Sequence, residues 1–221
     1  MKDLIGMSFW INNELNIEAD YTAGKVKKHK IIDINRFCDI VSKSSEVTEC
    51  NTGILPAGCI AYRENPKTFN RFVVLELKER RMNLTYEKTL YRDFPLPRLI
   101  YGFWVDRYGK VTSVKVTVAE NGKLTENTIL YEYPFSNVSD YKMCTGGNQL
   151  PTVKSLAQLE KMPYYIFSMP DNNDLYRKYN TKLNMEYRDL LEYLEDKDSD
   201  FYYSDVLVQN GETLSDFINR A

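Results

Sequence analysis

Residues 99–134, LIYGFWVDRYGKVTSVKVTVAENGKLTENTILYEYP, contain the pattern that decides the fold. Residues 99–105 are almost continuously apolar, and residues 111–118 alternate apolar with polar, so each run predicts a β-strand. Asn121-Gly122 is a hairpin signal, because both residue types tolerate positive φ. Residues 128–133 then predict the returning strand, and Pro134 ends it. The stretch therefore predicts an antiparallel meander.

The same period of two extends toward the N-terminus. Residues 72–77 are rich in β-branched and apolar side chains and predict a further strand, and residues 84–91 are expected to continue the sheet. Pro95 and Pro97 are expected to break it, since proline cannot donate to a ladder. We therefore predict a meander of about four strands.

Helical patterns flank the meander. Asp33 is a candidate cap for a helix over 34–43, and further helices are predicted over 153–161, over 175–194 and after Thr213 or Ser215. The acidic residues of the C-terminal third, among them Asp171 and Asp174, are expected on a solvated helix face. The order of elements indicates an α+β fold rather than alternating βαβ units.

The first fifty residues predict a separate element. Strands are expected over 4–11 and 15–21, and the basic run over 25–30 is expected to be a solvated loop. We expect residues 1–50 to form an N-terminal appendage, a hairpin and a helix, packed on the core. Residues 51–221 are expected to form the main domain with its C-terminal helices.

Composition excludes several classes of protein. The 221 residues carry 29 Lys and Arg against 31 Asp and Glu, which argues against dedicated nucleic-acid binding. The 43% of apolar residues excludes a disordered chain. No apolar run is long enough to span a membrane and no secretory signal is seen, so a cytoplasmic protein is expected. The cysteine spacing does not predict a metal site, and the single His29 excludes mechanisms that need two histidines.

Residues 135–151 form an irregular segment that contains the candidate chemistry. Cys144 lies beside two glycines between a predicted strand and a predicted helix, which suits a nucleophilic thiol. The alternative is that Cys144 is a small buried hydrophobic residue, as free cysteines often are. Asn137, seven residues earlier, could present its amide to a developing oxyanion without any histidine.

Several short motifs recur here in an order typical of one family. They are Pro134-Phe135-Ser136-Asn137-Val138, then Cys144-Thr145-Gly146, then Leu150-Pro151 before a short helix, with weaker echoes at 54–58 and 94–97. Following a meander, this order resembles the ubiquitin-conjugating-enzyme fold. It is most similar to the prokaryotic family D of such proteins, which includes protein B of the PRTRC (ParB-related, ThiF-related cassette) systems. The resemblance covers roughly residues 52–175.

The resemblance implies an activity. Cys144 would occupy the thioester-forming position, accept the C-terminus of a ubiquitin-like modifier from a ThiF-type activating enzyme, and pass it to an amine. Asn137 would match the Asn of the His-Pro-Asn turn, either buttressing the loop or stabilising the oxyanion. Phe135 and Ser136 stand where that turn has His and Pro. The resemblance implies no metal or organic cofactor, because the partner consumes the ATP.

Two departures from the family leave alternatives open, and the first is that the interval from Asn137 to Cys144 is one residue shorter than in eukaryotic conjugating enzymes. The family usually has Gly three residues before the cysteine, whereas this chain has Tyr141, which does not freely adopt positive φ. Without a glycine there, Asn137 and Cys144 are not expected to face each other. One class of function is a conjugating enzyme of a bacterial or phage modification system. The other is a catalytically inactive scaffold or binding module on the same fold in a mobile-element cassette, and exposure of Cys144 discriminates between the two.

Overall fold

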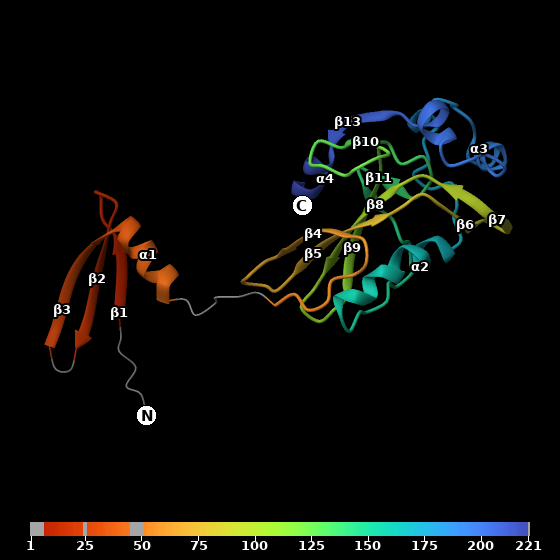
Figure 1. The fold of residues 1–221 in the computed structure, drawn as a ribbon. Helices are drawn as coiled ribbons and strands as arrows, with labels where there is room; N and C mark the ends of the chain where they lie inside the picture. The colour runs from red at the N-terminus through yellow and green to blue at the C-terminus, as the bar shows by residue number, and fades with distance from the viewer. Residues whose placement is uncertain (1–6, 24–25, 45–50, 221) are drawn as a thin grey trace. The chain divides into compact units, whose positions relative to one another are not determined.

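The computed structural model describes residues 7–23, 26–44 and 51–220, and the chain divides into two compact units, Met1–Asn51 and Thr52–Ala221 (Figure 1). The smaller unit contains an antiparallel sheet in the order β1-β2-β3, followed by a helix. Its elements are β1 (Met7–Ile11), β2 (Asn16–Ala23), β3 (Val26–Asp33) and α1 (Ile34–Ser44). The first residues of the strand predicted over 4–11 lie outside the described residues.

In the smaller unit, the structure confirms the predicted helix cap and contradicts the predicted loop. The predicted cap is confirmed, because the Asp33 carboxylate accepts hydrogen bonds from the backbone N–H groups of Asn35 (2.9 Å) and Arg36 (3.2 Å). The solvated loop predicted over 25–30 is wrong, since its described residues belong to β3 and pair with β2. An edge strand can expose lysines along its length, so its polarity resembles that of a loop.

The larger unit is built on an antiparallel sheet in the order β11-β12-β9-β8-β5-β4. In addition, β10 pairs with both β9 and β13. This architecture confirms the predicted α+β fold with its antiparallel meander. The strands are β4 (Cys59–Glu64), β5 (Arg71–Leu77), β8 (Leu99–Val105), β9 (Val111–Ala119), β10 (Ile129–Tyr131), β11 (Val138–Ser139), β12 (Lys142–Met143) and β13 (Gln209–Thr213).

Strands β6 (Arg80–Tyr86) and β7 (Thr89–Leu96) form a separate two-stranded hairpin. The single strand predicted over 84–91 is therefore wrong, because the chain turns at Glu87, where φ is +52°. Pro95 does not break the structure as expected but lies inside β7, opposite Arg81. A two-stranded hairpin leaves one edge of each strand unpaired, and a proline can occupy such an edge.

The helices are short. They comprise the 3-10 helix η1 (Leu156–Lys161), α2 (Met162–Ser168), the 3-10 helix η2 (Lys178–Asn180), α3 (Tyr187–Leu194), the π-helix η3 (Tyr202–Val206) and α4 (Leu214–Asn219). The helix predicted over 175–194 is wrong in its first half, since Leu175 and Asn184 have positive φ and only α3 is α-helical. The predicted start of the last helix is confirmed by a capping box between Thr213 and Asp216.

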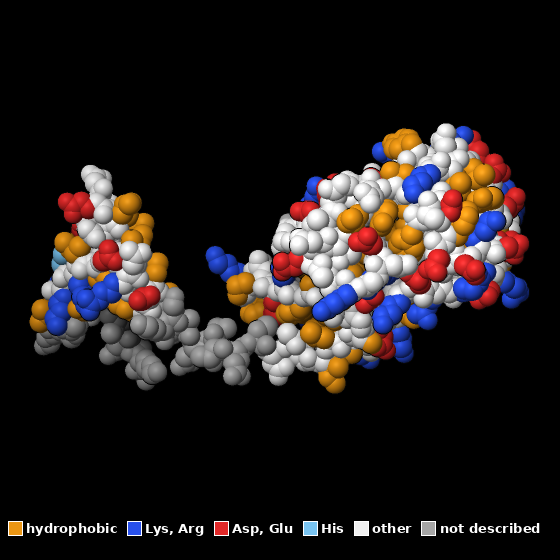
Figure 2. Space-filling view, turned by 45° about the horizontal axis from the view of Figure 1, so that its top comes forward, with side chains coloured by type: hydrophobic (Ala, Val, Ile, Leu, Met, Phe, Trp, Pro, Cys, Tyr) orange, Lys and Arg blue, Asp and Glu red, His pale blue; other side chains and the backbone are white. Residues whose placement is uncertain are grey.

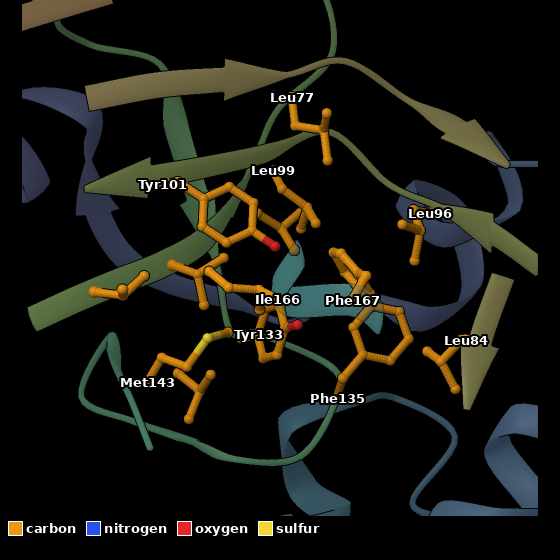
Figure 3. Close-up of a cluster of buried hydrophobic side chains, with 14 of the residues drawn as sticks. Leu77, Leu84, Leu96, Leu99, Tyr101, Tyr133, Phe135, Met143, Ile166 and Phe167 are labelled. Atoms are coloured by element: carbon orange, nitrogen blue, oxygen red, sulfur yellow. The ribbon is translucent and has the colours of Figure 1, made fainter. Parts of the chain in front are cut away.

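Helices cover both faces of the main sheet. On β5, Val73 and Leu75 belong to a core cluster that includes residues of α2 and α3, whereas Phe72 and Val74 pack in a second cluster with α4. Strands buried on both faces are apolar at nearly every position, as β8 is. Tyr133, which precedes the irregular segment, and Phe135 and Met143 within it reach into the first cluster (Figure 3). The core thereby anchors both ends of the candidate site.

Candidate functional site

A tight hairpin brings the two predicted site residues together. Strands β11 and β12 pair through the turn at Asp140 and Tyr141, whose φ values of +47° and +63° are typical of a type I′ turn. Asn137 precedes the hairpin and Cys144 follows it, and the Cys144 N–H donates to the Asn137 carbonyl at 2.7 Å. The six residues between Asn137 and Cys144 therefore form one closed hairpin.

Tyr141 adopts the conformation that the sequence was expected to forbid. Its φ of +63° lies in the left-handed region, which costs a non-glycine residue about 1–2 kcal/mol. Contacts of its side chain offset this cost. The ring packs edge-on against Phe217 at 5.3 Å, and the hydroxyl donates to Glu212 at 2.7 Å and accepts from Asn210 at 2.7 Å. Tyr141 thus adopts positive φ without being glycine, and the backbones of Asn137 and Cys144 meet, contrary to the expectation from sequence.

Cys144 is a free and exposed thiol, which excludes the alternative of a buried hydrophobic residue. It borders two hollows that share residues 143–146 and Asn148. We call the first, of about 110 Å³, the acidic hollow, because its described lining includes Asp171 and Asp174 and no Lys or Arg. We call the second, of about 440 Å³, the basic hollow, because its described lining includes Lys110 and Lys142 and no Asp or Glu.

The Asn137 side chain is directed at a carboxylate. Its Nδ2 donates to Asp171 Oδ1 and, at 3.3 Å, to Ser136 Oγ, while Ser136 Oγ donates to the same Oδ1 at 2.7 Å. The backbone N–H of Asn137 donates to the Asp174 carbonyl at 2.7 Å. Asn137 itself has a φ of +62°. The side-chain amide and the backbone N–H of Asn137 are therefore both engaged in hydrogen bonds.

Asp171 is the residue of this site that sequence reasoning missed. It was expected on a solvated helix face, but it is partly buried and pairs with the β6–β7 hairpin. Its N–H donates to Thr85 (2.7 Å) and its carbonyl accepts from Glu87 (2.9 Å). Tyr187 donates to its other carboxylate oxygen, Oδ2. Nothing in the local sequence signals this role, because Thr85, Ser136, Asn137 and Tyr187 all lie far along the chain.

Burial has the largest influence on the pKa of the Asp171 carboxyl. It raises the pKa of this carboxyl above its ordinary value, and hydrogen bonds from Tyr187, Ser136 and Asn137 partly oppose the shift. The carboxyl therefore depends on these three donors to hold its charge inside the acidic hollow. The three come from α3 and from the turn before β11, so the network also ties these elements together.

The remaining candidates are structural. Phe135 packs against Tyr133 at 5.3 Å in the core, and Ser136 is buried beneath the hairpin. His29, in the smaller unit, bonds to Asp20 at 2.7 Å. Within residues 7–23, 26–44 and 51–220, no group of three or more His, Cys, Asp or Glu could hold a metal ion. No helix among these residues is long and apolar enough to cross a membrane.

Surface charge matches the balanced composition. On the face that Figure 2 draws, Lys and Arg side chains of the larger unit are interspersed with Asp and Glu. A surface that binds nucleic acid through its phosphates usually gathers cations on one side.

The fold and the cysteine that follows β12 define an E2-like protein, related to the ubiquitin-conjugating enzymes. The family model described as prokaryotic E2 family D matches residues 39–210, and the chain belongs to this family. Membership confirms the predicted fold and family. It implies in general a ubiquitin-like modifier and an activating enzyme as partners. Neither a curated protein nor a solved structure shows significant similarity to the chain.

Proposed function

We propose that this protein carries a ubiquitin-like modifier as a thioester on Cys144 and passes it to an amine, in a bacterial or phage modification system with a ThiF-type activating enzyme. One observation carries the proposal. The exposed thiol of Cys144 lies between two hollows of opposite charge, held there by a closed hairpin. A scaffold on the same fold has no need of an exposed thiol in such a place.

The reaction is acyl transfer in two steps. In the first, the Cys144 thiolate attacks the thioester carbonyl at the C-terminus of the modifier, a new C–S bond forms, and the thiolate of the activating enzyme leaves. In the second, an amine nitrogen attacks the same carbonyl, a C–N bond forms, and the bond to Cys144 Sγ breaks. The amine loses its proton to solvent, and the Cys144 thiolate is regenerated.

The charge of the acidic hollow suits the amine, and the other hollow is then left for the modifier. Asp171 and Asp174 attract a cationic amine such as a lysine side chain into the acidic hollow. The larger basic hollow remains for the modifier tail, whose last carbonyl is joined to Cys144. Asn137 then supports the hairpin, since its amide donors are bonded to Asp171 and Ser136.

The test is the intact mass of the full chain, purified from its own host without reductant, before and after dithiothreitol. We expect a reducible adduct of several kilodaltons on the wild type and a thiol-resistant adduct on Cys144→Ser. Cys38→Ser is the matched control, because Cys38 is also exposed and should leave the adduct unchanged. Bare protein in every sample, from a host that expresses the modifier and activating enzyme, would favour the scaffold.

A further inference from the structure

Tyr141 is surrounded by a second group of residues, which lie far from Cys144 in sequence. We call Asn210, Glu212, Phe217 and Arg220 the C-terminal clasp. Asn210 and Glu212 hold the Tyr141 hydroxyl, each at 2.7 Å, and Phe217 packs against the ring. The guanidinium of Arg220 lies over the same ring, 5.8 Å from its centroid. All four side chains come from β13, α4 and the residue that follows.

The clasp holds both residues of the turn. Arg220 Nη1 pairs with the Asp140 carboxylate at 3.3 Å, and its Nη2 pairs with Glu212. The Arg220 carbonyl accepts from Lys115 on β9, the strand beside the hairpin. Asp140 and Tyr141 are the two residues that adopt positive φ between β11 and β12. The contacts therefore converge on the place where the backbone conformation is least favourable for non-glycine residues.

The turn at Asp140 and Tyr141 determines the position of the Cys144 thiol. With φ positive at both positions, the Tyr141 carbonyl accepts from Val116 at 2.8 Å and Val138 pairs with Met143. Cys144 follows Met143 directly, and its N–H closes the hairpin onto Asn137. If Asp140 and Tyr141 relaxed to negative φ, this register could not form. Cys144 would then leave its position between the two hollows.

We infer that Tyr141 is a positioning residue and that the C-terminal clasp, by holding it in the left-handed conformation, keeps Cys144 in its reactive position. The inference rests on the proposed function only in taking Cys144 as the reactive group. Glu212, Phe217 and Arg220 lie beyond residues 39–210, which match the family model. A glycine at position 141 would adopt positive φ without support. Tyr141 adopts it because the side-chain contacts of the clasp stabilise it.

The test is a double-mutant cycle in the full chain. Glu212→Ala should increase amide hydrogen exchange in the Val138–Cys144 peptide about tenfold, because a lost hydrogen bond to a charged group has at least that effect. It should slow acyl transfer from a synthetic glycine-terminated peptide thioester to Cys144 by a similar factor. In a Tyr141→Gly background, where positive φ needs no support, Glu212→Ala should change neither quantity.

Two further variants guard against trivial outcomes. Tyr141→Asn is a second background, since asparagine also tolerates positive φ and keeps a side chain at the site. Glu132→Ala is the matched control, because Glu132 lines the same cavity as Glu212 and should leave both readouts unchanged. Equal effects of Glu212→Ala in all backgrounds, or no effect in the wild type, would overturn the inference. The expected exchange pattern without acyl transfer in any variant would support the clasp and overturn the proposed function.

Discussion

The two units of this chain differ in how much apolar surface they bury. In the described part of the smaller unit, Ile17 and Ala19 are the buried apolar residues, while large side chains such as Phe9 and Trp10 are exposed. The larger unit has two packed clusters, one on each face of its sheet. Small units bury a smaller share of their surface and are less stable. The difference teaches that the hairpin before Cys144 belongs to the unit with the larger packed core.

The largest expected effect comes from replacing a phenylalanine by alanine in each unit. Phe103, on β8, is fully buried, so Phe103→Ala should lower the free energy of unfolding of the larger unit by about 3–5 kcal/mol. Phe9→Ala, at a side chain that is 51% exposed, should cost the smaller unit less than about 1 kcal/mol. Urea unfolding measures both. Equal losses would remove the distinction between the units.

A smaller effect concerns ion pairs within the larger unit. Glu76 pairs with Arg98 at 2.7 Å, and both side chains are nearly buried, so Glu76→Gln should cost about 1.5–3 kcal/mol. Glu87 pairs with Arg188 at 2.8 Å on the surface, where Glu87→Gln should cost about 0–1 kcal/mol. Unfolding in low and high salt separates the two cases. Strong salt dependence of the Glu76 pair would show that water reaches it.

The third prediction concerns pH. The folded-state pKa of Asp171 is raised by burial, so its contribution to stability is full below the ordinary carboxyl pKa of 3.8 and is lost as pH rises through the raised value. Asp171→Asn should remove this fall from the curve of unfolding free energy against pH. Asp216 is the control of opposite sign, because bonds from Thr213 lower its pKa. Asp216→Asn should instead remove a loss of stability that develops as pH falls below 3.8.

The smallest effect is expected from removing residues 1–51, which should leave the stability of the larger unit unchanged. The fragment 52–221 contains both apolar clusters, so its urea midpoint should equal that of the larger unit in the full chain. The alkylation rate of Cys144 with iodoacetamide should be unchanged as well. A lower midpoint for the fragment would show that residues before Thr52 stabilise the larger unit, and the contrast between the units would then weaken.

Prediction from sequence succeeded where the signal was local. Strands β8 and β9 follow from hydrophobic periodicity, and the caps at Asp33 and Thr213 follow from residue type. It failed where distant contacts decided the conformation. The helical spacing from Leu183 to Leu194 predicted a helix from residue 175, yet the ring centroids of Tyr176 and Tyr187 lie 4.8 Å apart and Leu175 has positive φ, which no α-helix accommodates. Contacts with residues distant in sequence decided the conformation of this segment.

The sequence by itself determined the α+β class, the meander, and Cys144 and Asn137 as candidates, because periodicity and short motifs are properties of neighbouring residues. Only the tertiary structure decided how the site is assembled. Asp171 faces Asn137 because the chain after α2 pairs with β6, and Tyr141 adopts positive φ because residues 210–220 surround its side chain. Both arrangements depend on contacts between segments far apart in sequence, whose energies outweigh the local backbone preferences.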